Sequence, residues 1–223
     1  MQRKIIAELL DEDRSTPEEI AASLGDLRHI NDWFGGTRTT IALLCRVAHE
    51  YSSRQLSVLE VGAGAGHVPL AAQRTLAREG IELHITLLDR ILSHLPARGT
   101  TSIVADALHL PFRDNSFDVV LSSLFAHHLE PAMLQLFIGE ALRVSQHAVL
   151  INDLIRSPVH LALVYLGLPL FRGRMTWHDA PASVRQAYTV DEMRELLSPL
   201  PKQRIEISRH YLYRMGVLVW KGQ

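Results

Sequence analysis

Polar and apolar positions along the chain divide it into two parts near residue 53. The first part has features of helices, because Thr16-Pro17-Glu18-Glu19 offers an N-cap, a first-turn proline and acids suited to a helix dipole. We expect this helix to end at Gly25. A second helix over about 37–51 follows Gly35-Gly36. Residues 1–52 therefore form an N-terminal helical cap.

From residue 56 onward, short apolar runs alternate with helical stretches of ten or more residues. Such alternation predicts parallel strands joined by crossover helices. The runs are almost entirely apolar, as in strands whose sheet is covered on both faces. We expect strands over 56–61, 83–88, 102–105, 117–122 and 148–152.

The last part of the chain has a different pattern. Two further apolar runs, 204–208 and 211–220, are separated only by a short turn around Arg209-His210, which predicts an antiparallel pair. Before them, residues 154–188 contain three prolines and several polar side chains. We interpret this stretch as an irregular lid over a pocket, inserted at about 154–188 into a domain that spans 53–223.

Composition narrows the class of partner. With 223 residues, 47% of them hydrophobic, the chain can bury a substantial core, and 23 basic against 24 acidic residues leave a net charge of −1. A chain without a basic field is not expected to bind nucleic acid, so a small molecule is the expected partner. A homodimer is left open.

Compartment and membrane association follow from a few residues. The N-terminal apolar run is interrupted by Glu8, unlike a secretory signal. The most apolar stretch, 158–171, contains His160 and Pro169 and falls short of the ~20 residues of a membrane span, so we expect no membrane insertion. The single Cys45 permits no intramolecular disulfide and no cysteine-built metal site. We expect a cytoplasmic protein.

A glycine-rich turn is the strongest chemical motif. The segment Glu60-Val61-Gly62-Ala63-Gly64-Ala65-Gly66 lies between a predicted strand and a predicted helix, where glycine lets the backbone turn and approach a ligand. A dinucleotide fingerprint starting at Gly62 would need a glycine at His67. This mismatch disfavours NAD or FAD and a nicotinamide-dependent oxidoreductase.

Two acidic positions follow the next predicted strands. Asp89 ends one strand and can accept hydrogen bonds from a ribose diol. Asp106-Ala107 follow the next strand, where an acid and a backbone amide can bind an adenine edge. Either acid could instead only cap a helix, but their shared place at strand ends beside the glycine turn favours a ligand crevice.

Together these motifs resemble a class I S-adenosylmethionine-dependent methyltransferase of the small-molecule type. The lid resembles, less specifically, that of bacterial polyketide- or quinone-pathway enzymes. The resemblance implies a Rossmann-like α/β fold, with a seven-stranded, mostly parallel sheet whose last strand is antiparallel and helices on both faces. It implies S-adenosyl-L-methionine as cofactor, bound by Glu60, Gly62, Ala63, Gly64, Gly66, Asp89, Arg90, Asp106, Ala107, Ser122 and Ser123.

Histidines and a strand-end acid are the candidate catalytic groups. His127 and His128 follow the fourth predicted strand, and we expect at most one of them to enter the site, since adjacent side chains point apart. Asp153 ends the fifth strand, and His178 precedes Asp179 in the predicted lid. Each could instead serve packing or an ordinary ion pair. We expect no metal, because sequence neighbours share an ion poorly and no ligand set is evident.

The acceptor pocket is expected to be apolar with a few polar groups. Its candidate residues are Trp33, Phe34, Phe125, Arg174, Met175 and Tyr188, although isolated aromatics are more often core anchors. We therefore expect methylation of a small, largely apolar acceptor, on an oxygen of a phenolic, polyketide-like or quinone-like compound. C-methylation of a quinone-like ring and cofactor binding without turnover remain alternatives.

Overall fold

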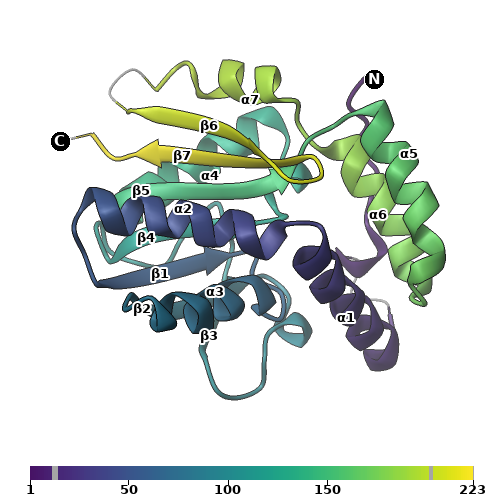
Figure 1. Cartoon of the computed structure of the whole chain (residues 1–223), viewed down its shortest axis with the longest axis horizontal. Helices are drawn as coiled ribbons and strands as arrows, with labels where there is room; N and C mark the ends of the chain where they lie inside the picture. The colour runs from purple at the N-terminus through teal and green to yellow at the C-terminus, as the bar shows by residue number, and fades with distance from the viewer. Residues whose placement is uncertain (12–14, 201–202, 223) are drawn as a thin grey trace.

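The computed structural model of the chain describes residues 1–11, 15–200 and 203–222, and its centre is a seven-stranded sheet between layers of helices (Figure 1). The strand order is β3-β2-β1-β4-β5-β7-β6. The strands are β1 (Gln55–Val61), β2 (Glu82–Asp89), β3 (Thr101–Val104), β4 (Phe117–Ser123), β5 (Ser145–Leu154), β6 (Ile205–His210) and β7 (Arg214–Trp220). The helices are α1 (Pro17–Trp33), α2 (Gly36–Glu50), α3 (His67–Arg78), α4 (Pro131–Val144), α5 (Pro158–Gly167), α6 (Arg174–Gln186) and α7 (Val190–Leu197).

Strand direction follows the expected Rossmann-like plan. β1 to β5 pair in parallel, and β7 runs antiparallel to both β5 and β6. β1 pairs with β2 on one side and β4 on the other, so the chain reverses its direction of travel across the sheet at β1. In open α/β sheets, ligands bind outside the carboxyl ends of the strands at this switch point. The predicted fold class is confirmed.

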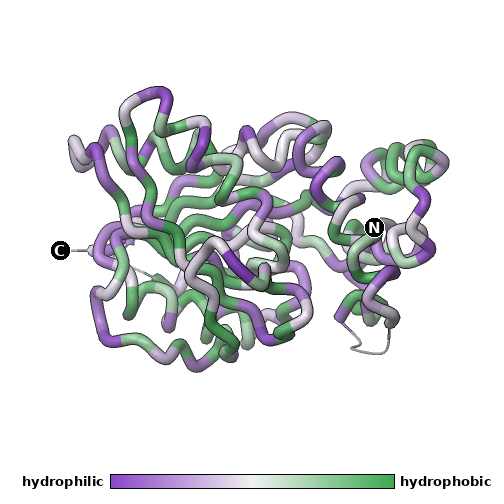
Figure 2. The backbone as a smooth tube through the Cα atoms, turned by 90° about the horizontal axis from the view of Figure 1, so that it is seen from below, coloured by the Kyte–Doolittle hydropathy of each residue, from purple (hydrophilic) through white to green (hydrophobic). Residues whose placement is uncertain are grey.

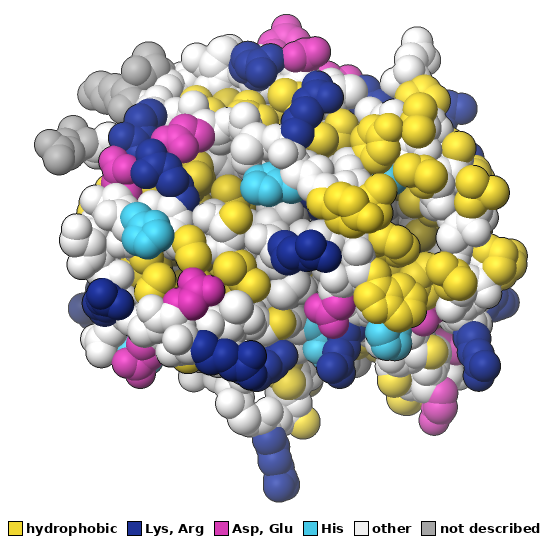
Figure 3. All heavy atoms as spheres, viewed as in Figure 1, with side chains coloured by type: hydrophobic (Ala, Val, Ile, Leu, Met, Phe, Trp, Pro, Cys, Tyr) yellow, Lys and Arg dark blue, Asp and Glu magenta, His cyan; other side chains and the backbone are white. Residues whose placement is uncertain are grey.

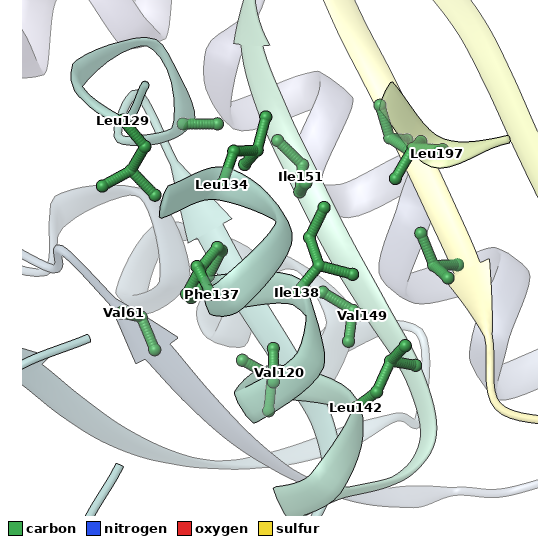
Figure 4. Close-up of a cluster of buried hydrophobic side chains, with 14 of the residues drawn as sticks. Val61, Val120, Leu129, Leu134, Phe137, Ile138, Leu142, Val149, Ile151 and Leu197 are labelled. Carbon is green, nitrogen blue, oxygen red and sulfur yellow. The ribbon is translucent and has the colours of Figure 1, made fainter. Parts of the chain in front are cut away.

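Two apolar layers hold the helices on the sheet. On one face α2 packs over β5 and β7 and α3 packs over β2, and Leu76 of α3 is fully buried together with Val58 and Leu121 of the sheet. On the other face α4 packs over β4 and β5, where Phe137 and Ile138 share one buried cluster with Val120 and Val149 (Figure 4). Because both faces are covered, the strand interiors are apolar, and their tubes in the middle of Figure 2 are largely hydrophobic.

The N-terminal helix is longer than expected. α1 continues through Gly25 to Trp33, although an interior glycine costs about 1 kcal/mol relative to alanine. A capping box joins Thr16 and Glu19 at its start, and the helix packs against α2 and α6. These tertiary contacts outweigh the local preference, and the helix ends instead before Gly35, whose φ is +82°.

The stretch 154–188 is not irregular, as its prolines suggested, but forms α5 and α6. Pro158 is the first residue of α5, where its missing N–H costs no hydrogen bond. These two helices, α1 and the N-terminal segment lie together beyond the carboxyl end of β1 (Figure 1). The last turn also differs from the prediction: β6 continues through His210, and β7 begins at Arg214.

A membrane span was not expected from the sequence. Within the described ranges, the model has no helix of the length and apolarity that crossing a bilayer requires.

Candidate active site

A cavity of about 810 Å³ lies at the carboxyl ends of the parallel strands. Its walls come from the N-terminal segment, α1, the glycine turn after β1, the ends of β2 to β5, and α5. Most of the lining side chains are apolar, and polar groups stand at the strand ends. This is the usual composition of a small-molecule site.

The glycine turn forms one wall of the cavity, and its backbone conformation favours glycine. Gly62 and Gly66 both have a φ of +68°, and a Cβ on Gly66 would lie 2.5 Å from Cδ1 of Leu87. Gly64 also has a positive φ, but a Cβ there would meet only Leu24, at 3.7 Å. The backbone at Gly64 is therefore open to the cavity.

Asp89 fixes this turn from the neighbouring strand. The Gly64 N–H donates to its Oδ2 at 2.8 Å, and the Ile91 N–H donates to its Oδ1 at 3.0 Å. The carboxylate also lines the cavity, and each oxygen has a second lone pair left for a ligand hydroxyl. Asp106 lines the cavity as well, and its Oδ1 accepts the Leu108 N–H at 2.9 Å, so local capping and ligand contact coexist there.

Glu60 brings a buried carboxyl group to the base of the cavity. It is only 1% exposed, and burial raises its pKa to about 8. Its Oε2 has no hydrogen-bond partner among the described residues. An unpaired buried acid next to a cavity is a candidate partner for a cationic ligand group.

The structure gathers most of the expected cofactor residues around one space. Gly66 and Ser122 do not line it: Gly66 packs on Leu87, and Ser122 is fully buried in β4. The residues that do line it are Glu60, Gly62, Ala63, Gly64, Asp89, Arg90, Asp106, Ala107 and Ser123.

His127 is held between two carboxylates at the acceptor end of the cavity. Its Nδ1 lies 2.7 Å from Oδ1 of Asp153, and its backbone N–H donates to Oδ2 of the same residue at 2.9 Å. Its Nε2 lies 3.4 Å from Oε1 of Glu8. Burial lowers the pKa of His127, but Asp153 and then Glu8 outweigh this effect and raise it to about 10.

His128 lies beside His127 and faces the same cavity. Its Nδ1 is 2.9 Å from Oδ2 of Asp11, and its Nε2 is 3.8 Å from Oε2 of Glu8. Both imidazoles line the cavity, contrary to the expectation that at most one would. The reason is local: they lie in a short 3₁₀ turn after Phe125, which brings the two ring centroids within 4.3 Å.

Asp153 and His178 do not reach the cavity wall. The Asp153 carboxylate instead contacts Nδ1 and the backbone N–H of His127. His178 pairs with Asp179 at 2.8 Å, and the Asp179 carboxylate accepts the backbone N–H groups of Leu9 and Leu10. This pair therefore fixes the N-terminal segment that covers the site.

The expected pocket residues separate in the same way. Phe34 and Phe125 line the cavity, whereas Trp33, Arg174, Met175 and Tyr188 do not. Met175 is buried in the protein interior. The Tyr188 hydroxyl donates to the Leu129 carbonyl at 2.6 Å.

Several polar residues on the wall were not selected from the sequence, and Glu8 and Arg214 are two of the buried ones. Glu8 is 8% exposed, and its Oε1 accepts hydrogen bonds from Ser183 at 2.6 Å and Gln186 at 3.0 Å. Arg214 is fully buried and donates to Asn31, and burial lowers its pKa to about 10. The one sequence feature that marks Glu8 is that it interrupts an apolar run.

Comparison with known proteins agrees with the fold. Residues 59–149 match the family model described as "Methyltransferase domain", and no curated protein matches the chain. Among solved structures, the plantazolicin methyltransferase BpumL, determined with a triazolic desmethylPZN analog and SAH, is similar at a TM-score of 0.71 and 13% identity, over 97% of this chain and 95% of that one.

Other similar structures share the sheet but less of the chain. A SAM-dependent methyltransferase from Aquifex aeolicus has a TM-score of 0.52 at 16% identity, over 78% of this chain and 87% of its own. The CMeT domain of the citrinin polyketide synthase has a TM-score of 0.54 at 12% identity, over 76% of this chain and 47% of its own. Residues 59–149 thus match a methyltransferase domain, and the chain has the fold of the class I S-adenosylmethionine-dependent methyltransferases.

Proposed function

We propose that this protein methylates an oxygen of a small, largely apolar acceptor, of phenolic, polyketide-like or quinone-like chemistry. The observation that carries the proposal is the single cavity that joins the glycine turn to the polar corner formed by Glu8, His127 and His128. Donor and acceptor can therefore meet in one cavity.

The residues present fit S-adenosylmethionine. The open backbone at Gly64 and the Asp89 carboxylate suit the nucleoside, whose diol can donate to that acid. The unpaired Oε2 of Glu60 suits the ammonium group of the amino-acid end, whose positive charge would favour the ionised form of this acid. When bound, the cofactor supplies a methyl group already activated on a sulfonium.

The surface around the cavity suits an apolar acceptor. Hydrophobic side chains gather at the end of the molecule where α5 and α6 lie (Figure 3). Apolar groups of α5, among them Leu163 and Val164, also line the cavity. The exposed members of this group include Val159, Leu163, Tyr165, Leu166, Leu170 and Trp177.

The polar corner favours the ionised form of an acceptor hydroxyl, whose proton leaves to solvent. A phenol has a pKa of about 10, so a nearby positive charge favours the oxyanion needed for attack. His127 carries that charge at neutral pH, since its pKa is about 10. The apolar wall excludes water, and His127 and His128 orient the acceptor oxygen.

Two measurements test the proposal. Calorimetry should show S-adenosylmethionine binding that Asp89→Ala weakens; absence of binding would refute the cofactor assignment. Labelled cofactor incubated with a panel of phenols should give O-methyl products. Exclusive formation of C-methyl or N-methyl products would refute oxygen as the acceptor atom, and tight binding without any transfer would indicate a cofactor-binding protein instead.

A further inference from the structure

The geometry points to a divalent transition-metal site formed by Glu8, His127 and His128. One carboxylate oxygen and the two imidazole nitrogens lie within 4.8 Å of one another. Sequence alone disfavoured a metal, because two adjacent histidines make an incomplete ligand set. The fold completes the set by placing Glu8 from the N-terminal segment against both rings.

The distances suit a small ion. The Nε2 of His127 is 3.4 Å from Oε1 of Glu8, and the Nε2 of His128 is 3.8 Å from Oε2. Ligands of a tetrahedral zinc ion, with bonds of about 2.0 to 2.1 Å, lie roughly 3.4 Å apart. Only small side-chain adjustments are needed to bring all three donors onto one ion.

Each ligand is already oriented by an outer partner. The Nδ1 atoms of His127 and His128 face the carboxylates of Asp153 and Asp11, at 2.7 and 2.9 Å. An Nδ1–H that donates to a carboxylate presents Nε2 to the ion, which is how metal-binding histidines are commonly held. Binding of the ion displaces the Nε2 proton that His127 otherwise carries at neutral pH. Glu8 is fixed in turn through its hydrogen bonds from α6.

An independent observation is the unsatisfied Nε2 of His127. The side chain is only 2% exposed, and among the described residues the Nε2 atom makes no hydrogen bond; Oε1 of Glu8 lies 3.4 Å away without hydrogen-bond geometry. Buried polar atoms are nearly always fully paired, so this one has bonding capacity left for a ligand. A metal ion bound to Glu8 and His128 would use this capacity.

The donor set defines the class of ion and the role of the site. Two imidazoles and one carboxylate suit Zn²⁺ or Fe²⁺ better than Mg²⁺ or Ca²⁺, which prefer oxygen ligands. All three residues line the cavity, so a further coordination position faces the acceptor. Three protein ligands with an open position are typical of catalytic metal sites.

The role of the ion rests on the proposed function. An acceptor hydroxyl that binds the ion loses its proton to solvent more readily, because the metal stabilises the resulting oxyanion. A lone pair of that oxygen then forms a bond to the methyl carbon. The carbon–sulfur bond breaks, and its electron pair stays on sulfur. The products are the methyl ether, S-adenosylhomocysteine and one proton.

Metal binding can be measured without any acceptor or cofactor. The full chain, stripped with a chelator and reloaded with Co²⁺ or Zn²⁺, should hold one ion per chain, and Co²⁺ should give visible bands of mixed nitrogen and oxygen coordination. Glu8→Gln and His128→Gln should each lower the affinity at least about tenfold, and Asp11→Asn, which removes an outer partner, by about 10- to 100-fold.

His84→Gln is the matched control, since His84 is an exposed imidazole 3.8 Å from a carboxylate of Glu82 and lies outside the cavity. It should bind the ion like the parent chain. Circular dichroism and S-adenosylmethionine binding check that each variant is folded. Absence of bound ion in the parent, or equal affinity in His128→Gln, would overturn the site.

The role of the ion is tested separately from the site. Methylation of the phenol panel should fall on chelation and return with Zn²⁺ or Fe²⁺. Undiminished methylation by the stripped protein would overturn the catalytic role. One bound ion in a chain that binds no S-adenosylmethionine would support the site while refuting the proposed function.

Discussion

The Glu60→Gln substitution should stabilise the protein increasingly as the pH rises. Glu60 is 1% exposed, and burial raises its pKa from 4.5 to about 8. Below pH 4.5 the acid is protonated in both the folded and the unfolded chain, so it has no effect. Above that value the Glu60 carboxyl ionises first in the unfolded chain. Folding must then either protonate this group again or bury its charge, and both cost free energy.

The magnitude follows from linkage. Each pKa unit corresponds to about 1.36 kcal/mol. Once the pH exceeds about 8, the shift of the Glu60 pKa from 4.5 to about 8 has therefore lowered the free energy of unfolding by roughly 4 to 5 kcal/mol. Glutamine has nearly the same shape and no charge to lose. The variant should therefore equal the parent near pH 4.5 and exceed it by about this amount above pH 8.

Urea unfolding followed by tryptophan fluorescence measures the difference directly. Subtracting the parent from the variant at each pH removes the contributions of other groups, including the His127 cluster. Glu82→Gln, on an exposed side chain of β2, should leave the difference near zero. A Glu60→Gln difference that does not change with pH would refute the assignment of Glu60 as a buried acid held neutral below its raised pKa.

Three further outcomes test the geometry of the site and its surroundings. Gly66→Ala should lower the melting temperature and abolish cofactor binding, because its φ is +68° and the new Cβ would lie 2.5 Å from Leu87. The control Gly99→Ala, with a φ of +93° and no atom near the new Cβ, should show only the effect of backbone strain. Equal effects of the two substitutions would argue against the clash. Asp89→Asn should weaken S-adenosylmethionine binding in calorimetry by about tenfold or more, through loss of a charge-assisted hydrogen bond, and an unchanged affinity would place the ribose elsewhere. Tyr188→Phe should cost about 1 kcal/mol in urea unfolding and leave the cofactor affinity unchanged, because its hydroxyl bonds to the Leu129 carbonyl and Tyr188 itself does not line the cavity.

The cofactor half of the cavity could be anticipated from local pattern. Strands covered on both faces are apolar runs that are visible in the sequence, and the glycine turn and Asp89 directly follow two of them. Since the carboxyl ends of parallel strands meet at one edge of the sheet, residues that directly follow such strands lie close together in space. The paired C-terminal strands were visible for a similar reason, although their turn lies beyond His210.

The helices over the cavity were harder to predict from the local sequence pattern. Prolines suggested irregular structure in 154–188, yet Pro158 only starts α5. The dense polar residues of that stretch also suggested an acceptor pocket. In the structure His178 and Asp179 instead fix the N-terminal segment. The periodicity of the local sequence does not indicate this contact.

The sequence by itself therefore determined the parallel sheet, the turn after β1 and the acids that follow β2 and β3, because burial on both faces makes each strand a short apolar run and these residues come directly after such runs. Only the tertiary structure decided that Glu8 would meet His127 and His128, and that both imidazoles would face the cavity. Those contacts join segments far apart in the chain. Their energy comes from charge and hydrogen-bond complementarity in a buried space, which no spacing of residues along the chain encodes.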